Sequence, residues 1–202
     1  MQEPLPTADR LEEISPGIFR WAAFSPFHRV ELTSHSVLAD GGLLVFDPIP
    51  LASEPQSRLN AFAGLPAIVL TNGNHFRASQ AWSARLGARV WSQTPDLFPA
   101  DLDIVHWSLI HSLPFGGWIA LPLPGGAPGE TAFLNAGLAL AVFGDAVVNL
   151  PGRSLELLPD QYCTDPRQLR LSLKGLPPFE RAIFAHGQPL HAGASDRIAA
   201  LL

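Results

Sequence analysis

The hydrophobic positions of the first fifty residues fall into short runs that are typical of β-strands. Four such runs lie at 18–24, 30–32, 34–39 and 43–46, and Ser25-Pro26 marks a turn between the first two. Between the last two, Asp40-Gly41-Gly42 is a strong hairpin signal because glycine permits positive φ angles. The pattern therefore predicts that the chain begins as a β-meander.

After this meander the pattern alternates between helix and strand. Residues 53–62 have helical spacing, and residues 67–71 form a continuous apolar run, as expected of a strand covered on both faces. A polar loop at 72–75 follows, and then a helical pattern over residues 76–86. Loops at the carboxyl ends of such strands are where α/β proteins commonly bind ligands.

The second half of the chain repeats this order. Strands are predicted at 118–123, 131–134, 138–143 and 146–149, then a helix at 166–174, a strand at 182–185 and a helix at 194–202. Asp165 suits the N-cap of the first of these helices, and Pro166 suits its first position. The Pro-rich segment from 94 to 117 shows no readable pattern.

Two similar halves, each a sheet with helices on one face, predict an α/β (α+β) fold built as a four-layer αββα sandwich. With 202 residues and 47% hydrophobic content, the chain suits a single domain spanning residues 1–202.

Charge and composition narrow the class of partner. The net charge of −5 and the lack of any basic run argue against nucleic acid and anionic membranes, and they favour a small-molecule ligand or another protein as the partner. The longest apolar stretch, residues 134–143, is shorter than the roughly 20 residues of a membrane span. Residues 1–6 lack the basic and apolar regions of a signal peptide, so we expect a cytoplasmic protein. The sequence does not indicate an oligomeric state.

Four polar segments stand at the ends of predicted strands and are expected to face one pocket. They are residues 72–77, Gly129-Glu130-Thr131, Gly144-Asp145 and Ala185-His186-Gly187. His75 suits a metal ligand or a general base, because the ordinary histidine pKa lies near neutrality, and it equally suits a loop histidine bonded to the backbone. Asn72 and Asn74 suit either the pocket lining or structural roles, Asn74 as a helix N-cap and Asn72 as a partner of the loop backbone.

In order and in context, these segments resemble the signature of the metallo-β-lactamase superfamily. That signature is a strand ending in T-H-x-H-x-D-H, a later P-G-H-T, a strand ending in G-D and a strand ending in G-H-G. The corresponding segments here are Thr71-Asn72-Gly73-Asn74-His75-Phe76-Arg77, Pro128-Gly129-Glu130-Thr131, Gly144-Asp145 and Ala185-His186-Gly187. The resemblance spans nearly the whole chain, and it implies the αββα fold and hydrolase chemistry.

The resemblance breaks at the metal ligands. Asn72 and Asn74 stand where the family motif begins with two histidines, and Phe76, Arg77 and Glu130 replace three further ligands. Carboxamides are poor zinc ligands and arginine has no acceptor atom, so no dinuclear zinc centre and no cofactor are expected. The chain is similar to a subset of the superfamily with T-N-x-x-H-x-R, whose activity is unassigned.

Our leading hypothesis is that Arg77 occupies part of the vacated metal volume and pairs with Glu130, Asp145 or both. The protein would then be a hydrolase for a small, anionic substrate, with His75 and His186 as acid and base and with Arg77 holding the anion. One alternative is a hydrolase with a single Zn, Fe or Mn ion held by His75, Glu130, Asp145 and His186. Another is a non-catalytic descendant of the fold that binds a ligand or a protein in the old pocket.

Overall fold

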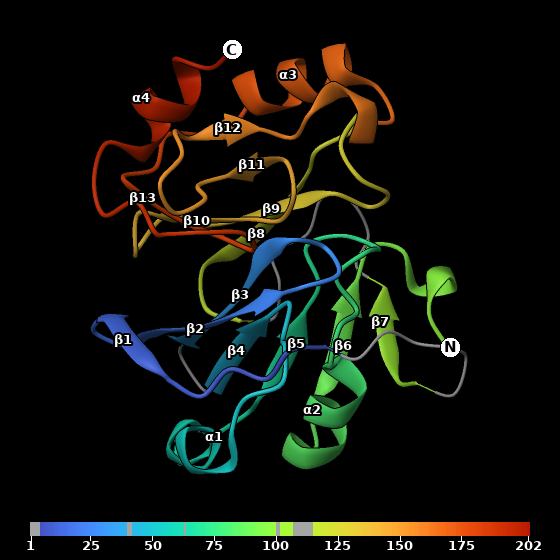
Figure 1. Cartoon of the computed structure of the whole chain (residues 1–202), viewed down its shortest axis with the longest axis vertical. Coiled ribbons are helices and arrows are strands. Elements are labelled where there is room, and N and C mark those ends of the chain that lie inside the picture. The colour runs from blue at the N-terminus through green and yellow to red at the C-terminus, as the bar shows by residue number, and fades with distance from the viewer. Residues whose placement is uncertain (1–4, 40–41, 63, 100–101, 107–114) are drawn as a thin grey trace.

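The computed structural model describes residues 5–39, 42–62, 64–99, 102–106 and 115–202, which form four layers (Figure 1). Two β-sheets pack face to face, and helices cover the outer face of each. The helices are α1 (Ser53–Asn60) and α2 (Ser79–Leu86) on one side, and α3 (Pro166–Lys174) and α4 (Ala194–Ala199) on the other. The predicted αββα sandwich is confirmed. In these ranges no helix is long and apolar enough to cross a membrane.

Within the described residues, the larger sheet has seven strands in chain order. They are β1 (Glu12–Ser15), β2 (Ile18–Ser25), β3 (Val30–Ala39), β4 (Gly42–Phe46), β5 (Ala67–Val69), β6 (Arg89–Ser92) and β7 (Ile104–His106). The pairs from β1 to β4 are antiparallel, and those from β4 to β7 are parallel. The predicted turn at 40–42 lies partly outside the described residues, and the strands on either side of it pair as expected.

One continuous strand, β3, replaces the two strands predicted at 30–32 and 34–39. Its central polar residues Thr33, Ser34, His35 and Ser36 are all buried. The two predicted strands were separated only by Thr33, and the second of them already included Ser34, His35 and Ser36. Here they lie inside because β3 occupies the middle of the sheet, between β2 and β4.

The smaller sheet has the strand order β13-β10-β9-β8. Its strands are β8 (Trp118–Pro122), β9 (Thr131–Asn135), β10 (Leu140–Phe143) and β13 (Arg181–Phe184). β13 runs parallel to β10, whereas the other pairs are antiparallel. A separate pair joins β11 (Val147–Val148) to β12 (Glu156–Leu157). β12 escaped prediction because two residues are too few to show an alternating pattern.

Alternation along the strands separates an inner core from two outer ones. In β4, Leu44 and Phe46 face the other sheet, whereas Leu43 and Val45 face the helices. Between the sheets, the Phe46 ring lies 5.4 Å from the ring of Trp118, measured between centroids. This run of four apolar residues is buried on both sides, as expected for a strand in the interior of a layered fold.

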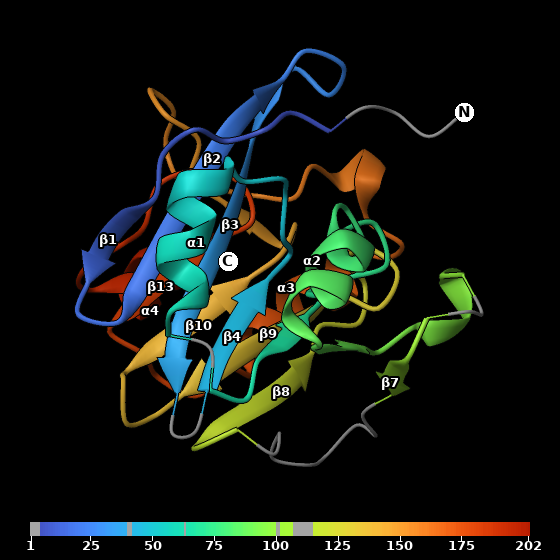
Figure 2. The same cartoon turned by 90° about the horizontal axis from the view of Figure 1, so that it is seen from below.

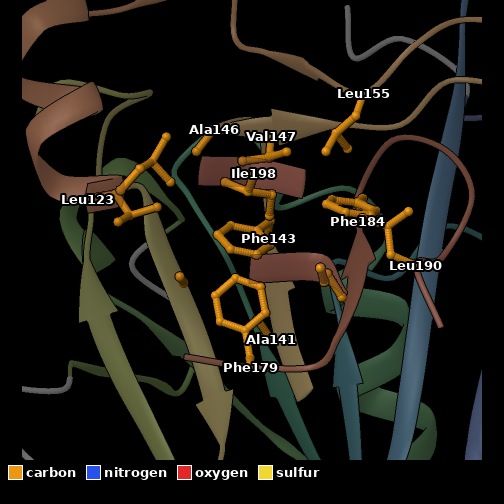
Figure 3. Packing of buried hydrophobic residues seen from close by; sticks show 14 of the residues in the cluster. Leu123, Ala141, Phe143, Ala146, Val147, Leu155, Phe179, Phe184, Leu190 and Ile198 are labelled. Carbon is orange, nitrogen blue, oxygen red and sulfur yellow. The ribbon is translucent and has the colours of Figure 1, made fainter. Parts of the chain in front are cut away.

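The outer cores lie under the helices. Figure 2 shows α1 and α2 lying over the larger sheet, where the rings of Trp21 and Trp82 stack at 5.3 Å. On the opposite side Phe143, Phe179 and Phe184 pack with residues of α3 and α4 (Figure 3). Full burial of such a side chain contributes about 1.5–3 kcal/mol, so these clusters hold the outer layers in place.

The sequence predicted the first residue of α3 correctly but not that of α2. α2 begins at Ser79 instead of residue 76, because Arg77 has a φ of 44°, which a right-handed helix cannot include. Its N-cap is therefore Ala78, and Asn74 does not cap the helix. α3 has the predicted bounds, and Asp165 accepts hydrogen bonds from the N–H groups of the second and third helical residues at 3.0 Å.

Candidate functional site

The polar segments at the strand ends meet at one edge of the sandwich. Because β4 runs parallel to β5 and β10 runs parallel to β13, the carboxyl ends in each pair lie side by side. Two backbone hydrogen bonds join the sheets near these ends. Thr33 N–H donates to the carbonyl oxygen of Ala185 at 2.9 Å, and Thr131 N–H donates to that of Thr71 at 2.8 Å. The four segments therefore form one site.

Asp145 lies at the centre of this site. Its Oδ1 atom is 3.1 Å from His75 Nε2 and 3.1 Å from His186 Nε2. These two nitrogens and a carboxylate oxygen lie within 4.8 Å of one another, so one metal ion could contact all three residues. Glu130 is not in this group, so the structure assembles three of the four ligands considered for a single metal.

Each of these histidines is oriented through its other ring nitrogen. His75 Nδ1 lies 3.0 Å from Asp47 Oδ2 and 2.9 Å from Thr71 Oγ1. His186 Nδ1 lies 3.1 Å from the carbonyl oxygen of Glu31, which can only accept a hydrogen bond. Both rings therefore turn Nε2 toward Asp145. Histidine ligands in metalloproteins are commonly fixed in this way by a carboxylate or a carbonyl behind them.

Asn72 connects the carboxyl groups of Glu130, which is buried, and of Asp145, which is partly buried. Its Nδ2 donates to Glu130 Oε2 at 2.8 Å and to Asp145 Oδ2 at 3.0 Å. Glu130 is 2% exposed, and its Oε1 accepts the N–H of Ala146 at 3.0 Å. Asn72 Oδ1 also accepts the N–H of Asn74 at 2.9 Å, so the structural role considered for Asn72 is present together with the bridging one.

Arg77 does not pair with Glu130 or Asp145, so that prediction is wrong. The guanidinium of Arg77 donates instead to three backbone carbonyl oxygens, those of Thr33 (2.8 Å), Asp47 (3.0 Å) and Ala185 (3.3 Å). Its Nη2 also lies 3.5 Å from His186 Nε2. The oxygens of Glu130 and Asp145 are already engaged by Asn72, by Ala146 N–H and by the two histidines. In the part of the chain that the structure describes, Arg77 makes no ion pair.

Burial and neighbouring charges set the protonation of the site. Burial alone would lower the pKa of His75, but the carboxylates of Asp145 and Asp47 raise it to about 9. Burial would raise the pKa of Asp145, but the adjacent His75 holds it well below its ordinary value. Burial lowers the pKa of His186 and raises that of Glu130 to about 8. At neutral pH the ligand-free site therefore pairs an imidazolium at His75 with a carboxylate at Asp145.

These groups lie at a cavity of about 1080 Å³. Five of the seven predicted site residues line it: Asn74, His75, Arg77, Asp145 and His186. The other two, Asn72 and Glu130, are buried behind the lining. The polar segments thus contribute both the surface of one pocket and the groups that support it.

Some residues of the site were missed by sequence reasoning. Asp47 follows β4 and supports His75, and its position directly after an apolar run is the same signal that pointed to Asp145. Thr71, at the end of the apolar run 67–71, bonds to the same carboxylate. The carbonyl groups of Thr33 and Glu31 act through the backbone, which carries no residue-specific signal.

Comparison with known proteins places the chain in a family. A family model described as the metallo-beta-lactamase superfamily matches residues 12–184. Among solved structures, the chain is similar to DIM-1 metallo-beta-lactamase, with 15% identity, 98% of each chain covered and a TM-score of 0.73. It is also similar to the metallo-beta-lactamase from Pontibacter korlensis, with 14% identity, 95% of this chain and 97% of that chain covered, and a TM-score of 0.70.

A third similar structure is a metallo-beta-lactamase family protein from Thermus thermophilus. It is 18% identical, the alignment covers 94% of this chain and 79% of that one, and the TM-score is 0.65. No curated protein matches the chain. At these identities the structural likeness shows the fold alone, whereas the family model matches most of the sequence. The chain belongs to the metallo-β-lactamase superfamily.

Proposed function

We propose that the chain is a hydrolase that works with a single divalent metal ion held by His75, Asp145 and His186. The observation that carries this proposal is the convergence of two imidazole nitrogens and one carboxylate oxygen within 4.8 Å. Three protein ligands with an open fourth position are the usual composition of a catalytic zinc site. Two histidines and one carboxylate also suit iron or manganese.

The proton positions at His186 support a cation at this point. Because Nδ1 donates its proton to the Glu31 carbonyl, a neutral His186 presents the bare lone pair of Nε2 to Asp145 Oδ1 at 3.1 Å. Two lone pairs at this distance repel each other unless a proton or a metal ion lies between them. Burial lowers the pKa of His186 and so disfavours the proton. A single metal ion therefore fits the donor set.

The same residues do not fit the dinuclear zinc centre of the family signature. Asn72 stands at a ligand position, but its amide nitrogen is used to donate to two carboxylates. Arg77 stands at another ligand position of that signature, and its guanidinium has no acceptor atom that could hold a second ion. We therefore derive no chemistry from a second ion.

The chain's own residues would prepare the site. Asp47 and the Glu31 carbonyl orient the two rings, and Asn72 turns Asp145 so that Oδ1 faces both histidines. When bound, a divalent ion supplies a Lewis acid and lowers the pKa of a bound water molecule toward neutrality. The side chains of His75, Asp145 and His186 are only 5–15% exposed, and this limited contact with bulk water strengthens the electrostatic interactions among them.

A second candidate function is ligand binding without a metal, and the charge balance of the site favours it. His75, whose pKa is raised to about 9, and Arg77 supply two positive charges against the carboxylates of Asp47 and Asp145. The cluster is therefore neutral without any added ion. In this case His75 and Arg77 would replace metal ions, and the pocket would bind a ligand without the family's hydrolytic chemistry.

Metal analysis separates the two candidates. The full chain is purified without chelator, incubated with Zn²⁺, Mn²⁺ or Fe²⁺, freed of excess ion and measured by elemental mass spectrometry. We expect about one ion per chain in the wild type and a loss of at least about tenfold in affinity in Asp145→Ala and His186→Ala. The exposed His191, outside the site, provides the matched control His191→Ala, which should keep the ion. Absence of stoichiometric binding for all three ions would reject the metal-dependent proposal in favour of the second candidate.

A further inference from the structure

The charged side chains around the cavity are already paired. Arg77 uses its terminal nitrogens on backbone carbonyls and His186, and Asp145 is engaged by two histidines and Asn72. Nearer the exposed surface, Arg153 Nη2 lies 2.8 Å from Glu156 Oε2. Among the described lining residues, no arginine or lysine remains without such partners. An anionic substrate would therefore meet no unpaired cation of the chain.

The remaining lining of the cavity is mostly apolar. Its apolar side chains come from both halves of the chain and include Val30, Leu32, Phe76, Val148, Leu150 and Leu158. Its exposed polar groups are the imidazole of His28, the amides of Asn74 and Gln80 and the phenol of Tyr162, and the two amides and the phenol carry no charge at neutral pH. Apolar walls favour an apolar body, and a buried charge without a partner is strongly disfavoured.

We propose that the substrates are neutral, largely apolar acyl compounds, with alkyl esters as the representative class, instead of the anionic substrate expected from sequence. This inference rests on the proposed hydrolase function. In the reaction, the oxygen of water bonds to the acyl carbon and the acyl carbon–alkoxy oxygen bond breaks. One proton of the water passes to the departing alcohol and the acid keeps the other, so no electrons are gained or lost.

Binding is tested apart from turnover by displacing the neutral, polarity-sensitive dye Nile red from the full chain in the presence of chelator. The competitors are methyl esters from butanoate to decanoate and the free carboxylates of the same chain lengths. We expect ester affinity to rise up to about fourfold for each added methylene, the factor that burial of one methylene gives. The matched carboxylates should bind at least about tenfold more weakly, because their charge enters the pocket unpaired. Carboxylates that bind as tightly as the esters, or esters whose affinity does not depend on chain length, would overturn the inference.

A charged residue introduced into the cavity lining tests whether the esters bind in this cavity. Leu150→Arg places a cation in the lining, so the esters should bind at least about tenfold more weakly and the carboxylates correspondingly more tightly. Leu171→Arg makes the same change at a residue of α3 that is 62% exposed and lies outside the lining, and it should keep the wild-type preference. If Leu150→Arg also keeps the wild-type preference, the ligands bind elsewhere and the inference fails.

Turnover distinguishes this inference from the proposed function. Esters that bind with the expected chain-length dependence but are not hydrolysed by the metal-loaded protein would reject the hydrolase and leave the ligand class standing. Hydrolysis of anionic substrates in preference to neutral esters would support the hydrolase and reject the proposed substrate class. Release of para-nitrophenol from octanoate and acetate esters by the metal-loaded chain measures this, and we expect the octanoate ester to have the higher kcat/KM.

Discussion

At the scale of single residues, the site depends on an amide that joins the buried Glu130 to the partly buried Asp145. Asn72 donates one hydrogen bond to Glu130 and one to Asp145, and the residue is 1% exposed. A neutral amide can bridge two carboxylates in this way without adding to their charge. The residue therefore controls where the Oδ1 atom of Asp145 points.

We predict that Asn72→Ala lowers the free energy of unfolding by about 1–3 kcal/mol, because one oxygen of Glu130 and one of Asp145 lose their donor. Urea denaturation measures this loss. Metal affinity should fall about 10–100-fold in the same variant if Asn72 orients the proposed ligand Asp145. Asn74→Ala is the matched control, since that side chain is exposed, and its effect should stay within about 0.5 kcal/mol. Equal losses in the two variants would contradict the bridging role.

His35 is a buried base whose charged form the fold excludes. Burial, helped by the positive charges of Arg20 and Arg77, lowers its pKa from 6.5 to about 3. Its Nε2 has no hydrogen-bond partner within the described residues. As the pH falls, the unfolded chain therefore binds a proton at His35 near pH 6.5, whereas the folded chain binds it only near pH 3.

Because the folded pKa of His35 lies below the unfolded one, its contribution to stability is present above pH 6.5 and is lost as the pH falls toward 3. Between these two pH values, the free energy of unfolding falls by up to about 1.4 kcal/mol for each pH unit. We predict that His35→Gln, which cannot titrate, makes the free energy of unfolding fall less steeply below pH 6.5. Urea titrations of both proteins across this range test it. Parallel pH curves for the two proteins would show that His35 does not titrate as described.

At the scale of elements, capping residues in the sequence predict the first residue of a helix only where the adjacent backbone is free to adopt helical angles. α3 begins where Asp165 and Pro166 predict, because the Asp165 carboxylate accepts from two free N–H groups of the first turn. α2 has no side-chain cap, and it begins late because Arg77 adopts a left-handed conformation beside the site. The contrast shows that the backbone conformation of Arg77, at the candidate site, ends the helical pattern predicted to run through it.

We predict that Asp165→Ala destabilises the protein by about 0.5–2 kcal/mol, because it removes the cap of α3 and leaves two backbone donors without their acceptor. The loss should appear as a lower midpoint of urea unfolding. The control is Asp9→Ala, the same replacement at an exposed residue, which should change stability by less than about 0.5 kcal/mol. A similar midpoint shift in both variants would mean that the cap does not contribute.

At the scale of the whole molecule, Arg77 ties the two sheets together. Its donors reach the carbonyl of Thr33 in the larger sheet, the carbonyl of Asp47 at the end of β4 and the carbonyl of Ala185 beyond β13. Such a set needs the flat, forked guanidinium with its several donors. We therefore assign Arg77 a clamping role across the sandwich, in place of the predicted pairing with carboxylates.

We predict that Arg77→Ala lowers the free energy of unfolding by about 2–4 kcal/mol, since it removes hydrogen bonds from a charged donor to three chain segments. Arg77→Lys should restore only part of the loss, because an ammonium group lacks the planar fork. Guanidinium chloride unfolding provides the measurement. Arg197→Ala, at an exposed arginine of α4, should have little effect. Full rescue by lysine would indicate that charge alone matters and would remove the clamping role.

Much of the fold followed from the order of residues. The apolar run 67–71 predicted a strand covered on both faces, and in β5 Ala67 and Val69 pack between the sheets whereas Ile68 packs under the helices. The glycine turns and polar strand ends predicted a common pocket at Asp145 and His186, and both line it. These features are local or repetitive, so hydrophobic period and turn residues are sufficient to indicate them.

Only the tertiary structure decided which polar groups meet. The partners of Arg77 are carbonyl oxygens at positions 33, 47 and 185, and any residue type would offer the same oxygen there. Asp47 and His75 are 28 positions apart, and their contact depends on β4 and β5 lying side by side. The order of residues thus determined the layers and the location of the site, whereas the packing of the two sheets determined its hydrogen bonds and charges.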